Sequence, residues 1–259
     1  MAYQARGKDR WSSLFPLHEL AAYPFEWAVF CDIDGTLLDL AETPTTIVVP
    51  HGLPADLELL SHNLGGALAL VTGRSVAFVD TLFATFQFPV AGLHGAEWRH
   101  PEGPLQSVSV SSEFDALKRA IVNEAGEWPG VLVEDKGAAI AVHYRLSPLR
   151  RRDVEAMMNR CAAIIAPDWV LQHGKMVSEL RPAGANKGNA VESFLACAPF
   201  SGRRPAVIGD DLTDEAMFRV ANARGGKSIR IAPLSAETSA HYGISSPVDL
   251  RRLLRTLVE

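Results

Sequence analysis

The sequence predicts an α/β protein whose core is a doubly wound, mostly parallel sheet, with an inserted α+β cap domain. Patterns typical of buried strands and of helices alternate in the first part of the chain, and the alternation resumes after Pro182. The segment between follows a different order, helix, hairpin, helix, hairpin, which is typical of an antiparallel α+β unit. We therefore expect a core domain formed by residues 1–104 and 182–259, and a cap domain formed by residues 105–181.

In the first part of the chain, short apolar runs alternate with segments that have apolar residues at helical spacing. Leu53, Leu57, Leu60 and Leu64 recur every three or four residues, and two glycines follow them as a stop signal. Strands that are apolar on both faces are expected in a parallel sheet, because helices cover both of its faces. The expected strands are 27–31, 67–75 with its turn, and 89–95; the expected helices are 53–66 and 75–86, after an irregular segment 1–26 with a short helix at 16–20.

The remaining elements follow from the same patterns. In the inserted segment, each helix precedes two short strands that meet at a turn, near Asp135–Gly137 and near His173–Gly174. The expected helices there are 111–128 and 147–166, and the strand pairs are 130–145 and 169–182. After Pro182 we expect helices at 186–198, 213–222 and 247–259, and strands at 204–211 and 227–232.

Composition and charge indicate an ordinary globular protein. The chain has 259 residues, of which 47% are hydrophobic and 21% charged, and its formal net charge is −5. A negative balance argues against a nucleic-acid partner and against an anionic membrane surface, because both select basic faces. A small phosphorylated substrate remains compatible, because a metal ion and a few lysines can balance its charge locally.

Several absences in the sequence predict a cytoplasmic protein. No uncharged run approaches the length of a membrane helix, and the N-terminus lacks the apolar region of a signal peptide. The three cysteines, Cys31, Cys161 and Cys197, are far apart in apolar company, so we expect buried thiols in a reducing compartment. We expect a monomer or a weak dimer.

Four motifs stand where an open α/β sheet binds its ligands, at the carboxyl ends of its strands. Asp32–Thr36, with the sequence DIDGT, follows the first strand, and Thr72–Arg74 follows the second. Lys187 lies near the start of a helix, and Gly209–Glu215, with the sequence GDDLTDE, ends a late strand. Together they place at least four carboxylates on one edge of the sheet: Asp32, Asp34, Asp210 and Asp214.

This acidic edge predicts a metal site. Clustered carboxylates repel one another and raise their own pKa values unless a divalent cation neutralises them. Ligands that are all oxygen favour a hard ion, and a site completed by waters and phosphate suits Mg²⁺. We expect Asp210 to hold the ion, whereas Asp211 could either bind it or cap the following helix.

The same residues suit phosphoryl transfer. Asp32, at the tip of the strand, is the expected nucleophile toward phosphorus, and Asp34 the expected general acid and then base. Thr72 would donate its hydroxyl and Lys187 its ammonium to the phosphoryl oxygens. Asp214 would orient Lys187 or a metal-bound water.

The motifs DxDGTL, TGR, a lone lysine and GDDxTDE, in that order, resemble those of haloacid-dehalogenase-type phosphohydrolases. More narrowly, the stretches GLHGAEWR, VEDKGAAIAVHYR, GKMVSELRPAGANKG and GDDLTDEAMF resemble trehalose-6-phosphate phosphatases, through the inserted segment as well. The resemblance implies Mg²⁺-dependent hydrolysis of trehalose 6-phosphate to trehalose and phosphate. It also implies that the metal is held by the side chain of Asp32, the backbone carbonyl of Asp34 and the side chain of Asp210.

The resemblance further implies that the cap recognises the disaccharide. Charged groups suit this task because each forms several strong hydrogen bonds with hydroxyls, and a closing cap would exclude water. The expected substrate-binding residues are Arg74, Glu134, Lys136, Arg145, Lys175 and Glu179. Without the resemblance, Glu134, Lys136 and Arg145 would instead be expected to form surface cross-strand pairs worth a few tenths of a kcal/mol.

Two alternative functions stay open at this point. Another sugar phosphatase, acting on sucrose phosphate or mannosyl-phosphoglycerate, would share every core motif and differ only in its cap. A sugar-phosphate sensor on the same scaffold could tolerate the loss of Asp32, Asp34 or Lys187, whereas this chain has all three.

Overall fold

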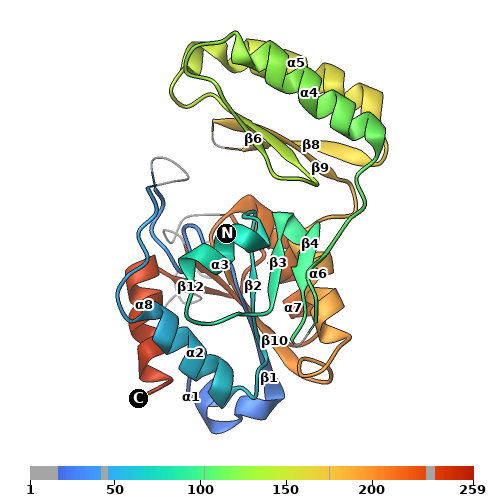
Figure 1. Cartoon of the computed structure of the whole chain (residues 1–259). Coiled ribbons are helices and arrows are strands. Elements are labelled where there is room, and N and C mark those ends of the chain that lie inside the picture. The colour runs from blue at the N-terminus through green and yellow to red at the C-terminus, as the bar shows by residue number, and fades with distance from the viewer. Residues whose placement is uncertain (1–16, 42–45, 102, 175, 232–236) are drawn as a thin grey trace, which may run out of the picture. The chain divides into compact units, whose positions relative to one another are not determined.

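The computed structural model describes residues 17–41, 46–101, 103–174, 176–231 and 237–259 (Figure 1). The chain divides into two compact units. The core unit comprises Met1–Gly95, Arg99–Pro104 and Asn186–Glu259, and the cap unit comprises Ala96–Trp98 and Leu105–Ala185.

Within the described residues, the main sheet has eight strands in the order β12-β11-β10-β1-β2-β3-β4-β5. The neighbouring pairs from β12 to β3 are parallel, and β4 and β5 form an antiparallel pair at the edge. The parallel strands are β1 (Trp27–Cys31), β2 (Leu68–Val71), β3 (Val90–Gly92), β10 (Arg204–Gly209), β11 (Lys227–Ile231) and β12 (Tyr242–Ile244). The edge pair is β4 (Glu97–Arg99) and β5 (Gln106–Ser107). The predicted fold class, α/β with a mostly parallel sheet, is confirmed.

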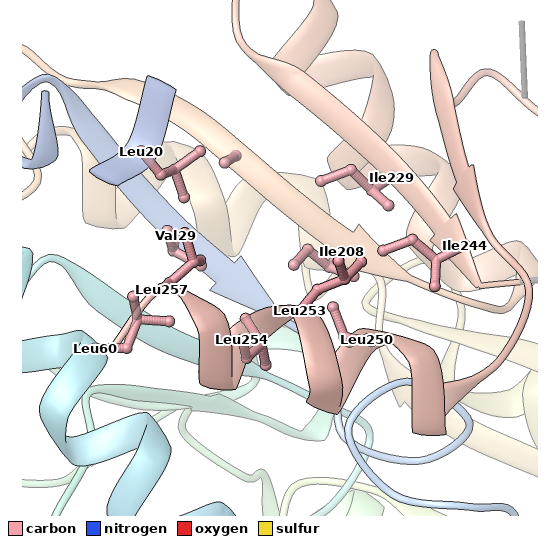
Figure 2. Close-up of a pocket in the computed structure, with 11 residues that line it drawn as sticks. Leu20, Val29, Leu60, Ile208, Ile229, Ile244, Leu250, Leu253, Leu254 and Leu257 are labelled. Atoms are coloured by element: carbon pink, nitrogen blue, oxygen red, sulfur yellow. The ribbon is translucent and has the colours of Figure 1, made fainter. Parts of the chain in front are cut away.

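Helices cover both faces of this sheet, which is why its central strands are apolar throughout. They are α1 (Leu17–Ala22), α2 (Leu53–Asn63), α3 (Val76–Leu82), α6 (Lys187–Leu195), α7 (Glu215–Ala223) and α8 (Pro247–Thr256). The 3₁₀ turns of this part are η1 (Pro24–Glu26), η2 (Leu93–Gly95) and η4 (Leu212–Asp214). Successive residues of β1 show the two faces: Val29 points to the side of α8 (Figure 2), whereas the ring of Phe30 lies 6.0 Å from that of Phe194 in α6.

The packing between α8 and the sheet is almost complete. Figure 2 shows Leu250 and Leu254 of α8 directed toward Val29 and Ile208, and only a cavity of about 10 Å³ remains among these apolar side chains. A space of this size is at the lower limit for a single water, so the layer between α8 and the sheet leaves no room for a ligand. Among the described residues, no helix is both long and apolar enough to cross a bilayer.

The cap unit packs two helices on one face of an antiparallel sheet with the order β6-β7-β9-β8 (Figure 1). Its elements are α4 (Ser112–Gly126), β6 (Leu132–Asp135), β7 (Ile140–His143), η3 (Pro148–Arg150), α5 (Arg151–Ile165), β8 (Trp169–Gly174) and β9 (Val177–Pro182). Ile140, Val142 and Leu180 belong to its own hydrophobic core, where the rings of Phe114 and Trp169 stack at 4.6 Å. Two-residue periodicity then places Glu134, Ala141 and Glu179 in one row across the sheet.

One expectation about the cysteines is wrong. Cys31 and Cys161 are buried as predicted, but Cys197 is exposed. Because α6 ends at Leu195, the helical periodicity that buries Phe194 does not extend to Cys197, which lies in the following turn. All three thiols are free.

Candidate active site

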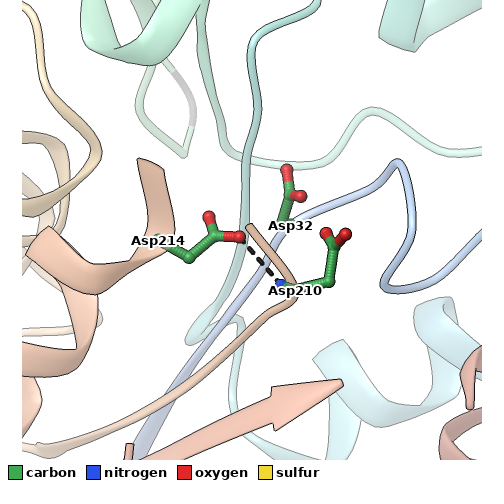
Figure 3. A group of neighbouring side chains, drawn as sticks. All are labelled: Asp32, Asp210 and Asp214. Atoms are coloured by element: carbon green, nitrogen blue, oxygen red, sulfur yellow. Dashed lines mark hydrogen bonds between the residues drawn. The ribbon is translucent and has the colours of Figure 1, made fainter. Parts of the chain in front are cut away.

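Sheet register brings the first and last motifs together. In the parallel pair β1–β10, Cys31 is the partner of Ile208, so Asp32 and Asp210, just beyond the strands, emerge at the same edge. Figure 3 shows these two side chains beside Asp214, and one carboxylate oxygen from each lies within 4.8 Å of the others. At this spacing the three carboxylates form a group that could hold one metal ion.

Lys187 lies between two of these carboxylates. Its Nζ is 2.7 Å from Asp32 Oδ1 and 2.6 Å from Asp214 Oδ1, and its side chain is 3% exposed. The side chain of Asn186 accepts a hydrogen bond from the backbone N–H of Asn189, which caps α6 and fixes Lys187 as its first residue. Burial alone would lower the pKa of Lys187, but Asp214 and Asp32 raise this pKa above the usual lysine value.

Asp214 orients its neighbours through both carboxylate oxygens. Oδ1 accepts a hydrogen bond from Lys187, and Oδ2 accepts from the backbone N–H of Asp211 at 3.0 Å. Oδ2 also accepts from the backbone N–H of Asp210 at 2.9 Å, the bond drawn in Figure 3. Of the two expected partners of Asp214, the structure therefore shows Lys187. A side chain at Gly209 would place its Cβ 2.3 Å from Asp214 Cγ, so this close approach requires glycine.

Asp211 does not join the cluster. Its side chain accepts a hydrogen bond from the backbone N–H of Leu212 at 2.6 Å and forms a capping box with Asp214 at the start of η4. Of the two alternatives left open by the sequence, the structure shows the capping arrangement.

The aspartates of the cluster carry more negative charge than Lys187 balances. Burial raises the pKa of Asp210 to about 7, and the nearby Asp214 contributes to this rise. Burial also raises the pKa of Asp32 well above its usual value, against the opposing effect of Lys187. The cluster would thus gain from an additional cation, and its all-oxygen donors suit a hard divalent ion.

Gly35 and Thr36 fix the position of Asp210, a role that the sequence alone did not indicate for Thr36. The hydroxyl of Thr36 donates a hydrogen bond to Asp210 Oδ1 at 3.2 Å. Gly35 has a φ of +79°, and a Cβ there would lie 2.3 Å from Asp210 Oδ2. The glycine of the DxDGT motif therefore allows a left-handed turn and also leaves space for the carboxylate of Asp210, which follows β10.

The TGR motif lies beside the DxDGT motif. Leu70 of β2 is the partner of Cys31, so the buried Thr72 follows its strand at the same edge as Asp32. Arg74 binds Asp34 with a two-pronged contact, Nε to Oδ2 at 2.8 Å and Nη2 to Oδ1 at 2.7 Å. The sequence predicted both residues for the site but not this pairing, because the loops that carry them are 40 residues apart.

In the cap unit, three of the five predicted sugar-binding residues come together. Lys136 Nζ lies 3.1 Å from Glu179 Oε1 and 3.9 Å from Glu134 Oε2. Arg145 is exposed, just beyond β7, and Lys175 lies outside the described residues. His143, which sequence reasoning did not connect with this group, lies 3.0 Å from Glu134 Oε2 through Nε2. In the hairpin register, Leu132 lies opposite His143 and Glu134 opposite Ala141, which makes Glu134 and His143 diagonal neighbours on one face. A prediction of this register would have shown that they are neighbours.

A parallel sheet with an acidic edge, a DxDGT turn after β1 and a buried lysine defines a phosphohydrolase of the haloacid-dehalogenase type. The sequence model of the family described as trehalose-phosphatase matches residues 30–248, and the chain belongs to this family. The predicted family and the prediction of a phosphatase are confirmed.

Individual proteins agree with this assignment. A probable trehalose-phosphate phosphatase of Sinorhizobium fredii is 54% identical over 231 residues, covering 89% of this chain and 87% of that protein. A trehalose-6-phosphate phosphatase of Escherichia coli is 39% identical over 239 residues, covering 91% and 88%. The C-terminal domain of trehalose-6-phosphate phosphatase from C. albicans has the same fold, with a TM-score of 0.81 at 21% identity, over 94% of this chain and 97% of that one.

Proposed function

We propose that this chain hydrolyses trehalose 6-phosphate to trehalose and phosphate. The names of the Sinorhizobium and Escherichia relatives support the substrate. The observation that carries the chemistry is the position of Lys187, buried between Asp32 and Asp214 beside the carboxylate of Asp210. A fixed cation next to a carboxylate at a strand tip is what in-line attack on a charged phosphoryl group requires.

Asp32 is the proposed nucleophile. One of its carboxylate oxygens forms a bond to phosphorus while the bond between phosphorus and the sugar oxygen breaks. Asp34, protonated once one of its oxygens leaves the guanidinium of Arg74, donates that proton to the departing oxygen, and trehalose leaves. Asp34 then takes a proton from a water whose oxygen attacks phosphorus, which releases phosphate and restores Asp32.

Lys187 and Thr72 are proposed to bind the phosphoryl oxygens. Lys187 is held protonated by Asp32 and Asp214, because both carboxylates raise its pKa. Thr72 is 1% exposed at the end of β2, and its hydroxyl accepts a hydrogen bond from the backbone N–H of Arg74 at 3.2 Å. That contact directs the hydroxyl proton of Thr72 away from Arg74 and leaves it available for a phosphoryl oxygen.

The proposed metal is Mg²⁺. The side chains of Asp32 and Asp210 and the backbone carbonyl of Asp34 would hold it, and when bound it would neutralise charge on the phosphoryl oxygens. The fit rests on the short distance between the Asp32 and Asp210 oxygens and on the raised pKa values of both carboxyl groups. Asp214 is proposed as a positioning residue, because its two oxygens already bind Lys187 and the backbone of the acidic loop.

We also propose that the cap unit recognises the disaccharide. Lys136, Glu134 and Glu179 form a compact charged group with both donors and acceptors, which suits the hydroxyls of a sugar. Arg145 and Lys175 remain proposed members of this group on the family resemblance. Arg74 remains a proposed substrate-binding residue, with Asp34 as a protein partner.

The test is a panel of phosphate esters assayed for phosphate release with Mg²⁺ and with EDTA. The expected result is a clear preference for trehalose 6-phosphate over sucrose 6-phosphate, mannosyl-phosphoglycerate and glucose 6-phosphate, with activity lost in EDTA and restored by Mg²⁺. A preference for glucose 6-phosphate would refute the substrate, and full activity in EDTA would refute the metal. Binding of trehalose 6-phosphate without phosphate release would indicate a sensor instead.

We further propose a cytoplasmic location and a monomer or weak dimer. The free thiols of Cys31, Cys161 and Cys197 suit a reducing compartment. Fractionation of cells and analytical ultracentrifugation of the purified chain test these two points.

A further inference from the structure

Arg230 of β11 connects three segments at the acidic edge. Its Nε donates a hydrogen bond to the backbone carbonyl of Asp210 at 3.3 Å. Its Nη1 lies 3.4 Å from Glu215 Oε1 and donates a hydrogen bond to the backbone carbonyl of Glu237 at 2.7 Å. The register of β10 and β11, with Gly209 opposite Arg230, places this side chain beside the residue that follows β10.

Glu215 completes the connection. It is 8% exposed at the start of α7, and its carboxylate accepts hydrogen bonds from the hydroxyl of Thr238 at 2.6 Å and the backbone N–H of Ser239 at 2.8 Å. A buried carboxylate with two donors and a guanidinium around it is held in one orientation. Glu215 therefore holds Arg230 on one side and the segment from Thr238 onward on the other.

The consequence falls on Asp210. Its backbone N–H donates to Asp214 Oδ2 at 2.9 Å, and its carbonyl accepts from Arg230. Both backbone groups of Asp210 are thus fixed by side chains from different elements, and this determines the direction of its Cα–Cβ bond. We propose that Arg230 and Glu215 are positioning residues for the divalent cation, because they hold the Asp210 carboxylate where it can share an ion with Asp32. This inference rests on the metal site of the proposed function.

Arginine suits this place better than lysine. Two nitrogens of one planar guanidinium divide the acceptors: Nε contacts the carbonyl of Asp210, and Nη1 contacts both Glu215 and Glu237. A lysine ammonium is a single point charge and cannot reproduce this arrangement. Residues one step removed from a metal typically change its affinity 10–100-fold when they are replaced.

The experiment measures the midpoint of thermal unfolding of the metal-free full chain at increasing Mg²⁺, which separates intrinsic stability from the dissociation constant for Mg²⁺. R230M is expected to raise this dissociation constant about tenfold or more, and R230K and E215Q to raise it by smaller factors. In assays of phosphate release, the Mg²⁺ concentration for half-maximal rate should rise in parallel, while kcat at saturating Mg²⁺ stays near the wild-type value.

The exposed ion pair of Arg224 and Glu192, on α7 and α6, provides the matched controls R224M and E192Q, which should keep the wild-type dissociation constant. Variants that unfold at lower temperature but bind Mg²⁺ as the wild type does would show a purely structural role and overturn the proposal. If R230M does not fold, R230K and E215Q decide by the same criterion. A wild-type chain that Mg²⁺ stabilises no more than D210N would instead refute the metal site itself.

Discussion

Arg74 holds Asp34 through two parallel hydrogen bonds, from Nε at 2.8 Å and from Nη2 at 2.7 Å, and so joins the loop after β2 to the loop after β1. Both side chains are largely shielded from solvent, with 17% and 26% exposed. Because the planar guanidinium matches the carboxylate in two places, it fixes both the position and the plane of the Asp34 carboxylate.

Replacing Arg74 by lysine tests this contact. Lysine keeps the charge but can hold Asp34 at one point only, so the carboxylate of the proposed general acid loses its fixed orientation. We expect kcat for phosphate release to fall about tenfold or more in R74K. The matched control is R99K, because Arg99 also forms a two-pronged contact, with Asp80 elsewhere in the core unit, from Nη1 at 2.8 Å and Nη2 at 2.7 Å. Equal rates in R74K and R99K would contradict the prediction.

Replacing Lys187 by methionine tests the buried ion cluster. The change removes the cation between Asp32 and Asp214 and leaves two buried carboxylates without it, which should lower the free energy of unfolding by about 3–5 kcal/mol. Urea unfolding in EDTA measures this difference. The control K227M, which removes the looser pair with Glu19 at 3.7 Å, should change the free energy of unfolding by less than about 1 kcal/mol. A K187M protein as stable as K227M would be inconsistent with this account.

The Asp32→Asn variant tests the proposed nucleophile. The amide keeps the shape of the side chain but cannot attack phosphorus, so phosphate release should fall by about 10⁴-fold or more. Binding of trehalose 6-phosphate, measured by calorimetry, should persist. The control D39N alters a more exposed aspartate on the same loop, paired with Arg251, and should leave the rate unchanged. Substantial phosphate release by D32N would refute the proposed role of Asp32 as the nucleophile.

Because the three cysteines differ in burial, we expect thiol reagents to react with them selectively. Burial raises the pKa of Cys31 to about 12, and burial also raises the pKa of Cys161, so both thiols stay protonated near pH 8. Iodoacetamide should therefore label the exposed Cys197 rapidly and the other two only after unfolding, and C197S should remove the fast phase in mass spectra. Rapid labelling of Cys31 in the folded protein would contradict this burial.

The same pKa shift has a consequence for stability at high pH. The thiol of Cys31 ionises near 9.0 when unfolded and near 12 when folded, so above about pH 9 the folded state binds more protons than the unfolded state. This contribution to the free energy of unfolding therefore falls as the pH rises through that range. C31A should flatten the decline, as measured by urea unfolding from about pH 8 to pH 11.

The sequence predicted the long, strongly patterned elements and missed several of the short ones. β1 has the expected bounds, and α2 begins at the expected residue and ends three residues earlier, because continuous apolar runs and helical spacing are strong signals. The strands β4, β5 and β12 have only two or three residues each, too few for periodicity to be seen. They exist because a neighbouring strand edge offers their backbone groups hydrogen bonds, which the sequence does not display.

That several charged side chains would gather at one sheet edge was predicted better than the contacts among them. Asp32, Lys187, Asp210 and Asp214 stand in motifs whose positions after strands or at a helix start predict one shared edge. The contact between Thr36 and Asp210 spans 174 residues of sequence, so no local pattern indicates it. The pairing of Arg230 with Glu215 could not be predicted either. The two residues are 15 positions apart, and no local pattern shows that the fold brings them together.

What the sequence determined by itself was the fold class and the set of charged groups at one edge of the sheet, because strand periodicity and motif order are local properties of the chain. Only the tertiary structure decided which carboxylate each cation holds. Ion pairs and hydrogen bonds depend on distances of a few ångströms between loops far apart in sequence, and the register of β1, β2, β10 and β11 sets those distances.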